Sequence, residues 1–329
     1  MQLTVEKLVY GGDGLARLPA DEHGRGKAMF IPFVLEGEKV EAALLEQKPG
    51  FARGRADQIL ESSSYRTSPD CRYFQRCGGC HYQHTSYEHQ LEIKAAILKE
   101  NLRRIARLEL DTELKIHPSP AWNYRNRTRV KVQTTPEFAL GYYKFNSHEL
   151  LAVEECPISS SLINRAMAAI WRMGRAGKVI GEIQEIEFFA NAEDSQLLLE
   201  IYCAADSTPA TVKQLAEELR QALPDVAGVV LLKNHVAGRN AKSVGEPERL
   251  AVSGDAELTY KTNFGPYRVS AGAFFQVNRY LTDELVNTVT AGRSGRTAID
   301  LYAGVGLFSS VLNREFERVI AVESSPTSY

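Results

Sequence analysis

Short stretches in which apolar and polar residues alternate follow one another over residues 1–62. Period-two alternation predicts strands at residues 3–5, 29–31, 39–42 and 55–59. Turn residues separate these strands at 11–14, 36–38 and 48–50. Regular short strands of this kind predict a small, OB-like β-barrel. Because acidic residues there are at least as numerous as basic ones, the charge of the barrel favours RNA binding no more than a spacer role.

The pattern changes over residues 63–262, where helical and strand-like stretches are mixed. Behind a capping box that begins at Thr85, apolar residues recur at helical spacing and predict an amphipathic helix over 86–107. Its expected apolar face comprises Leu91, Ala95, Leu98, Leu102 and Ile105. Further on, the pattern predicts strands at 183–189, 197–202 and 229–232, with a helix at 211–223. An α+β central domain is therefore expected.

Within this domain, basic and aromatic residues interleave over residues 122–131. Four cations recur at period two: Arg125, Arg127, Arg129 and Lys131. On a strand they would lie on one face and repel one another, which favours a phosphate partner. Trp122 and Tyr124 add surfaces on which unpaired bases could stack. The alternative is a solvated strand face whose cations pair with acids elsewhere in the chain.

Residues 263–329 predict the start of an α/β domain. Helices are expected at 277–291 and 307–316, and strands at 297–302 and 319–323. A strand, a turn containing Gly304 and Gly306, a helix and Glu323 after the second strand are typical of a nucleoside-cofactor site. Asp300, four residues before the first glycine, suits S-adenosylmethionine better than NAD. The alternative is an ordinary strand-to-helix turn.

Four of the five cysteines form one pattern, Cys71-x5-Cys77-x2-Cys80 with Cys156-Pro157 far downstream. Thiolates in a Gly-rich loop with a distant Cys-Pro favour an iron–sulfur cluster over a disulfide framework. The alternative is a structural zinc site in which His81 or His84 replaces one thiolate. The spacing also differs from the Cys-x3-Cys-x2-Cys of radical enzymes, which makes that class a weak alternative.

Composition narrows the function classes further. The chain has 329 residues, is 44% hydrophobic and carries a formal net charge of −2. This length predicts two or three domains with cores of their own. We expect no secretory signal and no membrane partner, because no charged n-region with an apolar stretch and no run of 18 apolar residues occurs. Few cysteines in a sizeable chain indicate a reducing cytoplasm, and a monomer is expected.

Together these features resemble the RNA uracil-C5 methyltransferases, in particular their ribosomal-RNA branch. The residues that carry the resemblance are the four cysteines, Tyr124-Arg125-Asn126-Arg127, Phe274-Phe275-Gln276-Val277-Asn278 and the stretch from Asp300 to Leu307. It implies a TRAM β-barrel at 1–62, an RNA-binding central domain at 63–262 with a [4Fe–4S] cluster on the cysteines, and a Rossmann-like methyltransferase domain at 263–329. It also implies S-adenosylmethionine contacts from Gln276, Tyr302, Leu307 and Glu323, and RNA, in particular rRNA, as partner.

One departure from the family concerns the chemistry. The family has a catalytic cysteine and a glutamate base later in the sequence than position 329, so we expect a C-terminally truncated chain that is inactive by itself. The one thiol outside the cluster set, Cys203, lies in an apolar strand and is expected to be buried and structural. Ala303, where many relatives have cysteine, is expected to be harmless. A second function class stays open: a non-catalytic RNA-binding protein with an iron–sulfur or zinc site.

Overall fold

The computed structural model describes residues 1–20, 26–179, 183–203, 209–233 and 248–328. It divides into two compact units. The first comprises Met1–Pro118 and Lys144–His148, and the second comprises Ser119–Tyr143 and Glu149–Tyr329. Among the described residues, no helix combines the length and apolar character that crossing a membrane requires.

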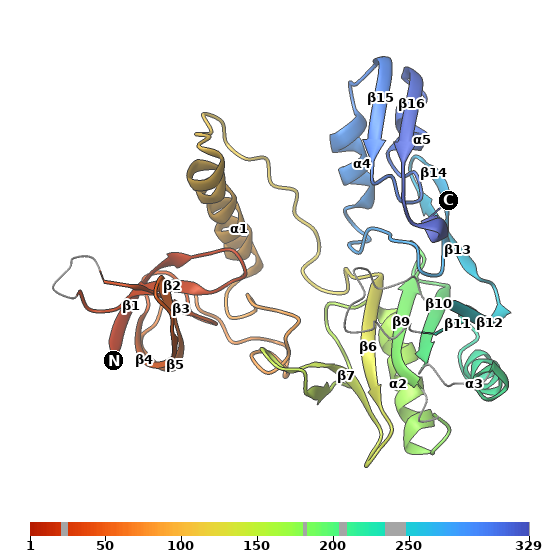
Figure 1. The fold of residues 1–329 in the computed structure, drawn as a ribbon, viewed down its shortest axis with the longest axis horizontal. Coiled ribbons are helices and arrows are strands. Elements are labelled where there is room, and N and C mark those ends of the chain that lie inside the picture. The colour runs from red at the N-terminus through yellow and green to blue at the C-terminus, as the bar shows by residue number, and fades with distance from the viewer. Residues whose placement is uncertain (21–25, 180–182, 204–208, 234–247, 329) are drawn as a thin grey trace. The chain divides into compact units, whose positions relative to one another are not determined.

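Five strands of the first unit close a barrel in the order β1-β2-β3-β5-β4, drawn in red and orange in Figure 1. They are β1 (Gln2–Leu8), β2 (Gly14–Arg17), β3 (Ala28–Ile31), β4 (Lys39–Gln47) and β5 (Phe51–Glu61). Alternate residues of β1 point inward, so that Leu3 and Val5 pack with Met29, Ile31 and Val40 in the barrel core. The predicted barrel is confirmed. The sequence pattern missed β2, because its first residue belongs to the predicted Gly-rich turn.

The predicted helix after the barrel is also present, as α1 (Tyr87–Asn101) followed by a π-helical turn (Leu102–Ala106). The Ser86 hydroxyl caps it by accepting the His89 N–H. The predicted apolar face was wrong. Ile93 is the buried residue and packs with Leu8 and Leu35, whereas Leu98 and Ile105 are exposed. Side chains one helical turn apart, at 93 and 97, therefore form the packed face, and the leucine stripe lies on another side.

The second unit is built on a seven-stranded sheet with the order β12-β11-β10-β9-β6-β7-β8. Its strands are β6 (Arg127–Gln133), β7 (Ala139–Tyr143), β8 (Leu150–Ala152), β9 (Ile183–Ala190), β10 (Leu197–Cys203), β11 (Val226–Lys233) and β12 (Glu248–Gly254). α2 (Ser161–Arg175) contacts β7 and β9, and α3 (Pro209–Ala222) contacts β11 and β12. Every residue of β10 is buried, since this strand lies inside the sheet. The strands and the helix predicted over 183–232 are confirmed.

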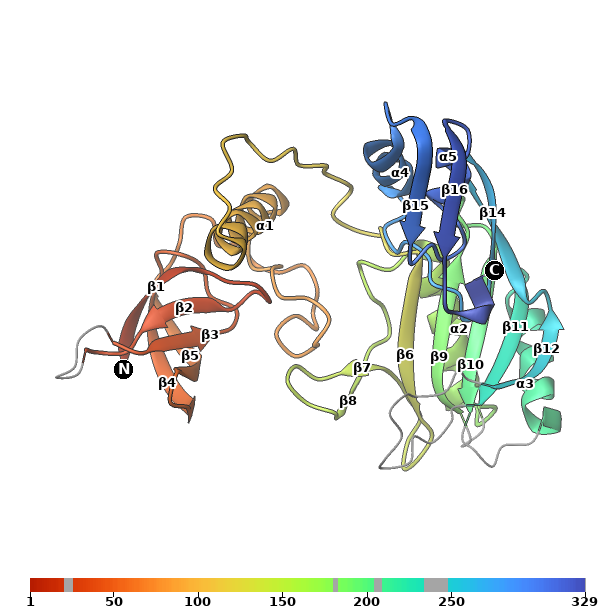
Figure 2. The same cartoon turned by 45° about the horizontal axis from the view of Figure 1, so that its top comes forward.

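The remaining elements, drawn in cyan to blue in Figures 1 and 2, are the hairpin β13 (Glu257–Thr262) and β14 (Gly265–Ser270), α4 (Thr282–Thr290), β15 (Gly295–Leu301), α5 (Ser309–Leu312), β16 (Phe316–Val322) and the 3₁₀ turn η2 (Pro326–Ser328). The β13–β14 hairpin lies beside the sheet, and α4, β15, α5 and β16 lie beyond one end of it. One hydrophobic core joins them to the sheet through Phe189, Tyr260, Phe275, Val286 and Leu307. β15 and β16 pair in parallel, as a strand–helix–strand unit requires.

Two helices in this region are shorter than predicted. The first begins at Thr282 rather than at 277, because Leu281 donates its N–H to the Asn278 carbonyl and closes a turn before the helix. The second, α5, ends at Leu312 rather than at 316, since Phe316 already belongs to β16. Both strands of the prediction are present.

Candidate functional site

The turn after β15 is the centre of the predicted cofactor site. Three of its residues have positive φ angles: Tyr302 at 63°, Gly304 at 56° and Gly306 at 79°. Glycine adopts this left-handed conformation without steric cost, whereas a tyrosine does so rarely. Tyr302 is also 91% exposed, so its ring is held out from the turn into solvent. The backbone of this turn is therefore open to a molecule that approaches the end of β15.

Two carboxylates flank the turn. Glu323, just after β16, accepts the Gly304 N–H at 2.7 Å through Oε2 and the N–H groups of Ser324 and Ser325 through Oε1. The Ser325 and Gly304 N–H groups lower the pKa of Glu323, so it is an ionised acceptor near neutral pH. Asp300, buried at the end of β15, accepts the Ser309 hydroxyl at 2.5 Å and so ties the strand to α5.

The segment that carries Gln276 runs beside this turn. Its Phe275 is buried in the shared core, whereas Phe274 is 65% exposed, so one of the two phenylalanines is a packing residue. A Cβ built on Gly304 would lie 3.9 Å from the Phe274 carbonyl oxygen. The Gln276 carbonyl accepts the Asn126 side-chain amide at 3.0 Å. The segment that carries Gln276 is thus bonded to Asn126, just before β6, and passes the glycine turn at Phe274.

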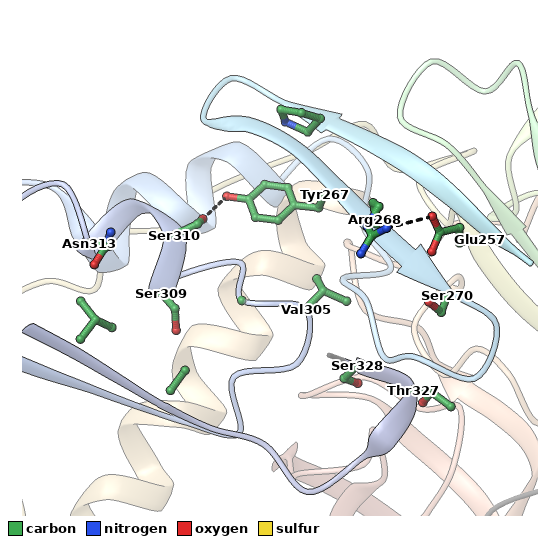
Figure 3. A pocket seen from close by; sticks show the side chains of 14 residues that line it. Glu257, Tyr267, Arg268, Ser270, Val305, Ser309, Ser310, Asn313, Thr327 and Ser328 are labelled. Carbon is green, nitrogen blue, oxygen red and sulfur yellow. Dashed lines mark hydrogen bonds and ion pairs between the residues drawn. The ribbon is translucent and has the colours of Figure 1, made fainter.

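A cavity of about 640 Å³ lies between β14, α5 and β16, and Gly306 is one of the residues that line it (Figure 3). On its wall the Tyr267 hydroxyl lies 2.7 Å from the Ser310 hydroxyl, and Arg268 lies 3.7 Å from Glu257. Of the residues predicted to bind the cofactor, Gly306 lines this cavity, while Gln276, Asp300, Tyr302 and Glu323 do not. Leu307 is buried in the core, where its carbonyl accepts the Tyr267 hydroxyl.

The predicted row of cations is only partly a strand face. Arg127, Arg129 and Lys131 do lie on one face of β6, but Arg125 precedes the strand and is held by bridges to Ser159 and Asn278. Trp122 and Tyr124, further upstream, are half-buried.

The reason for expecting a phosphate partner was wrong. Each of the three strand cations has a carboxylate partner: Arg127 with Glu187 at 2.9 Å and Glu200 at 3.0 Å, Arg129 with Glu187 at 2.5 Å, and Lys131 with Glu185. The register pairs Arg129 with Glu187 and Lys131 with Glu185 directly across β6 and β9. The cations therefore do not repel one another unopposed, and the alternative of acids elsewhere in the chain is what the structure shows.

Sequence reasoning missed the acidic side of this network. Glu200, in the buried strand β10, accepts the Tyr202 hydroxyl at 2.8 Å, and that hydroxyl in turn accepts from Arg129 at 2.5 Å. Burial raises the pKa of Glu200, while Arg127 opposes the rise. Two signals could have found these residues. Glu185 and Glu187 recur at period two in a predicted strand, and Glu200 is a lone acid within an apolar run.

The four predicted cluster ligands are divided between the two units. Cys71, Cys77 and Cys80 are half-buried in the first unit, where the Gly79 N–H approaches the Cys77 sulfur at 3.4 Å, and Cys156 belongs to the second unit. Nowhere in the described parts of the chain do three His, Cys, Asp or Glu side chains gather as a metal site. The iron–sulfur cluster therefore stays a prediction from cysteine spacing and family resemblance.

Neither histidine of the zinc alternative is directed to a thiol by a described contact. His84 Nε2 lies 3.3 Å from the Val34 carbonyl, and burial lowers the pKa of His84 to about 4. The His81 ring contacts the rings of Phe33 and Phe145. Cys203, in β10, is fully buried as predicted.

Comparison with protein families gives two matches. A family described as tRNA (Uracil-5-)-methyltransferase matches residues 86–329, and a TRAM domain matches residues 1–56. Similar sequences include an uncharacterized RNA methyltransferase of Aquifex aeolicus, 31% identical over 331 residues that cover all of this chain and 72% of the relative. Another, from Caldanaerobacter subterraneus, is 27% identical and covers 98% of this chain and 72% of its own length.

A solved structure shares the fold. It is the crystal structure of Pyrococcus abyssi tRNA (uracil-54, C5)-methyltransferase in complex with S-adenosyl-L-homocysteine. The alignment covers 99% of this chain and 74% of that chain, with a TM-score of 0.69. At 20% sequence identity the likeness shows the fold alone.

Proposed function

This chain belongs to the tRNA (uracil-5-)-methyltransferase family, and from this premise we propose that it serves S-adenosylmethionine-dependent methylation of uridine C5 in RNA. The observation that carries the proposal is the open glycine turn after β15 with an ionised acid held against it. Glu323 accepts three backbone N–H groups, which leaves about one lone pair, on Oε2, for a ribose hydroxyl. Methyltransferase membership and this turn point to the same cofactor.

Each residue near the turn has a distinct part in this proposal. Glu323 accepts from the ribose, Gln276 meets the methionine end, and the Tyr302 turn with Gly304 and Gly306 contacts the cofactor along its backbone edge. Asp300 orients α5 through Ser309, since its carboxylate already accepts that hydroxyl. Leu307 supports the turn from the hydrophobic core. When bound, the cofactor supplies an electrophilic methyl group on a sulfonium.

The acceptor carbon needs help, because C5 of uracil is a poor nucleophile. A thiolate that adds to C6 creates an enolate, C5 then takes the methyl group, and a base removes the C5 proton as the thiolate leaves. The target base would have to be flipped out of its stack to reach these groups. Cys203 is unsuited to attack, because it is fully buried in β10. We therefore do not propose Cys203 as the nucleophile.

The RNA partner is proposed to lie along the exposed end of the β6 row. Arg129 keeps 44% of its side chain exposed and Lys131 keeps 32%, with the rings of Tyr202 and Tyr143 next to them. Arg125, Trp122 and Tyr124, which precede the strand and are half-buried, are proposed as further RNA contacts. Arg127 is buried and is removed from the set of direct phosphate contacts. Ribosomal RNA is the proposed target, because the cysteine pattern resembles that of the ribosomal-RNA branch. The TRAM barrel is proposed as a second RNA contact.

The [4Fe–4S] cluster stays a proposal supported by cysteine spacing and resemblance. Purified protein is expected to contain about four iron atoms and four sulfides per chain, and serine at Cys80 should reduce both. One zinc per chain in place of iron would contradict the cluster and favour the zinc alternative. On the same resemblance we propose three domains, at residues 1–62, 63–262 and 263–329. A monomeric state and a cytoplasmic location are proposed as well.

Cofactor binding tests the central step without RNA. Titration of the protein with S-adenosylhomocysteine should give a dissociation constant that Glu323→Ala weakens about tenfold or more, because a charged acceptor is lost. Glu315→Ala, before β16, is the matched control and should leave binding unchanged. Equal affinity in wild type and Glu323→Ala would remove Glu323 from the site.

A further inference from the structure

Two charged side chains of the central sheet hold the segment that carries Gln276. The Gly272 N–H donates to Glu200 Oε1 at 3.0 Å, and the Arg127 guanidinium donates to the Ala273 carbonyl. Beside them, the Asn126 N–H donates to the Val277 carbonyl at 3.0 Å. Residues 272–277 are therefore fixed by backbone hydrogen bonds to a sheet rather than by their own secondary structure.

These two side chains form a buried pair. Glu200 is 1% exposed and Arg127 is 9% exposed, and Arg127 Nη2 lies 3.0 Å from Glu200 Oε1. Arg127 also reaches Glu187 through Nε at 2.9 Å. One planar guanidinium thus donates to the Glu200 carboxylate and the Ala273 carbonyl in fixed directions, which the single ammonium of lysine cannot reproduce, while Glu187 lies at ion-pair distance. Burying an ion pair costs desolvation free energy, so the pair contributes chiefly by fixing the geometry of the groups that it bonds.

The opposite side of the same segment faces the cofactor turn. The Phe274 carbonyl lies 3.9 Å from the Cβ position of Gly304, and the Cβ position of Gly272 lies 3.4 Å from the Thr327 side chain. The segment is therefore placed between the buried pair on one side and the turns after β15 and β16 on the other. A shift of its backbone would move Gln276 and press on Gly304 together.

We propose that Arg127 and Glu200 are positioning residues for the cofactor: the pair sets the backbone of residues 272–276 and thereby the place of Gln276 against the glycine turn. Neither side chain touches the cofactor in this account. The inference rests on the proposed function, because it takes Gln276 and the Gly304 turn as the cofactor site.

The test compares variants that keep size but break the pair, Arg127→Lys and Glu200→Gln, in the protein as its gene encodes it. Both should raise the dissociation constant of S-adenosylhomocysteine and the KM for S-adenosylmethionine about tenfold, as expected for a weakened charged hydrogen bond. The kcat at saturating cofactor and the KM for RNA should change by about twofold or less. Arg165→Lys and Asp225→Asn, which break an exposed pair of 3.1 Å in the same unit, are matched controls.

The outcomes separate the claims. Unchanged cofactor binding in both variants, with normal wild-type binding, overturns the inference alone. A fall of the apparent kcat in proportion to the unfolded fraction, with both KM values unchanged, assigns the pair a purely structural role and also overturns it. Wild-type protein that neither binds S-adenosylhomocysteine nor methylates RNA overturns the proposed function and the inference with it. If Arg127→Lys does not fold, Tyr202→Phe removes only the hydroxyl on Glu200 and on Arg129, and about a threefold weakening is expected.

Discussion

Glu100 lies at the surface and Glu200 lies inside a sheet. Each of these glutamates accepts hydrogen bonds from an arginine and from a second donor. At the end of α1, Glu100 accepts from Lys7 at 2.6 Å and from Arg103 at 2.7 Å, which lowers the pKa of Glu100 to about 2. In β10, Glu200 accepts from Arg127 and from the Gly272 N–H, yet burial raises the pKa of Glu200. At Glu200 the cost of burial outweighs the pairing with Arg127, whereas at Glu100 the hydrogen bonds from Lys7 and Arg103 dominate.

The exposed and the buried pair also differ in the groups to which they bond. Glu100 joins side chains that keep much of their contact with water, so the bonds replace hydration at little net gain. Glu200 and Arg127 instead bond to the backbone at Gly272 and Ala273, where water does not compete. The exposed pair thus links only side chains at the surface, whereas the buried pair fixes the backbone position of residues 272 and 273.

The largest expected effect comes from breaking the buried pair outright. Glu200→Ala leaves Arg127 buried without one of its carboxylates and should lower the free energy of unfolding of the second unit by about 3–5 kcal/mol. Urea titration followed by fluorescence measures the loss. Glu100→Ala is the control at the surface and should barely move the unfolding midpoint. Similar losses for the two variants would contradict the contrast drawn between them.

A smaller effect is expected from the neutral neighbour of the pair. Asn126→Ala removes the donor to the Gln276 carbonyl and to the Tyr260 hydroxyl, which should cost about 1–3 kcal/mol of unfolding free energy. Gln133→Ala, at the exposed end of β6, the strand that follows Asn126, is the matched substitution and should cost little, because its one described bond of 3.4 Å faces water. A loss at Gln133 as large as at Asn126 would show that strand position, not burial, sets the cost.

The two glutamates should also give stability opposite pH slopes. The folded-state pKa of Glu200 is raised, so its contribution is fullest at low pH and declines as pH rises from about 4.5 through the folded pKa. The folded-state pKa of Glu100 is lowered, so its contribution is present above about 4.5 and is lost as pH falls towards 2. Unfolding titrations from pH 3 to 8 on Glu200→Gln and Glu100→Gln should remove one slope each. The same change of slope in both would refute the assignment.

Salt should produce the smallest difference. Sodium chloride at about 1 M shortens the screening length to about 3 Å, which weakens the exposed contacts of Glu100 but hardly reaches Glu200. The stability difference between wild type and Glu100→Gln should therefore vanish in salt, while that of Glu200→Gln should persist. Persistence of both differences would mean that the Glu100 contacts are better shielded than their exposure indicates.

Much of the fold follows from sequence pattern, and the exceptions have physical causes. Alternation located four of the five barrel strands, and apolar runs located β9, β10, β11, β15 and β16. The apolar face of α1 was wrong because Ile93 and Ile97, not the leucines, contact Leu8 and Leu35. Helical periodicity shows that a helix has an apolar side, but the partner surface decides which side packs.

The site divides in the same way. The glycine turn and Glu323 could be located from local sequence, because a strand, a turn and an acid lie close along the chain. The buried network could not, since Arg127 and Glu200 are 73 residues apart and meet only when β6, β9 and β10 align. Period-two cations were read as a phosphate surface because their partners lie on strands far along the sequence.

Formation of 5-methyluridine tests the central claim most directly. The protein as its gene encodes it would be incubated with methyl-labelled S-adenosylmethionine and with either ribosomal or transfer RNA, and the RNA digested to nucleosides. The account predicts label in 5-methyluridine, from ribosomal RNA in preference, at a rate that falls in Glu323→Ala. If only transfer RNA yields labelled 5-methyluridine, the proposed substrate changes from ribosomal to transfer RNA. Label in another nucleoside, or none while the wild type remains folded, would contradict the account.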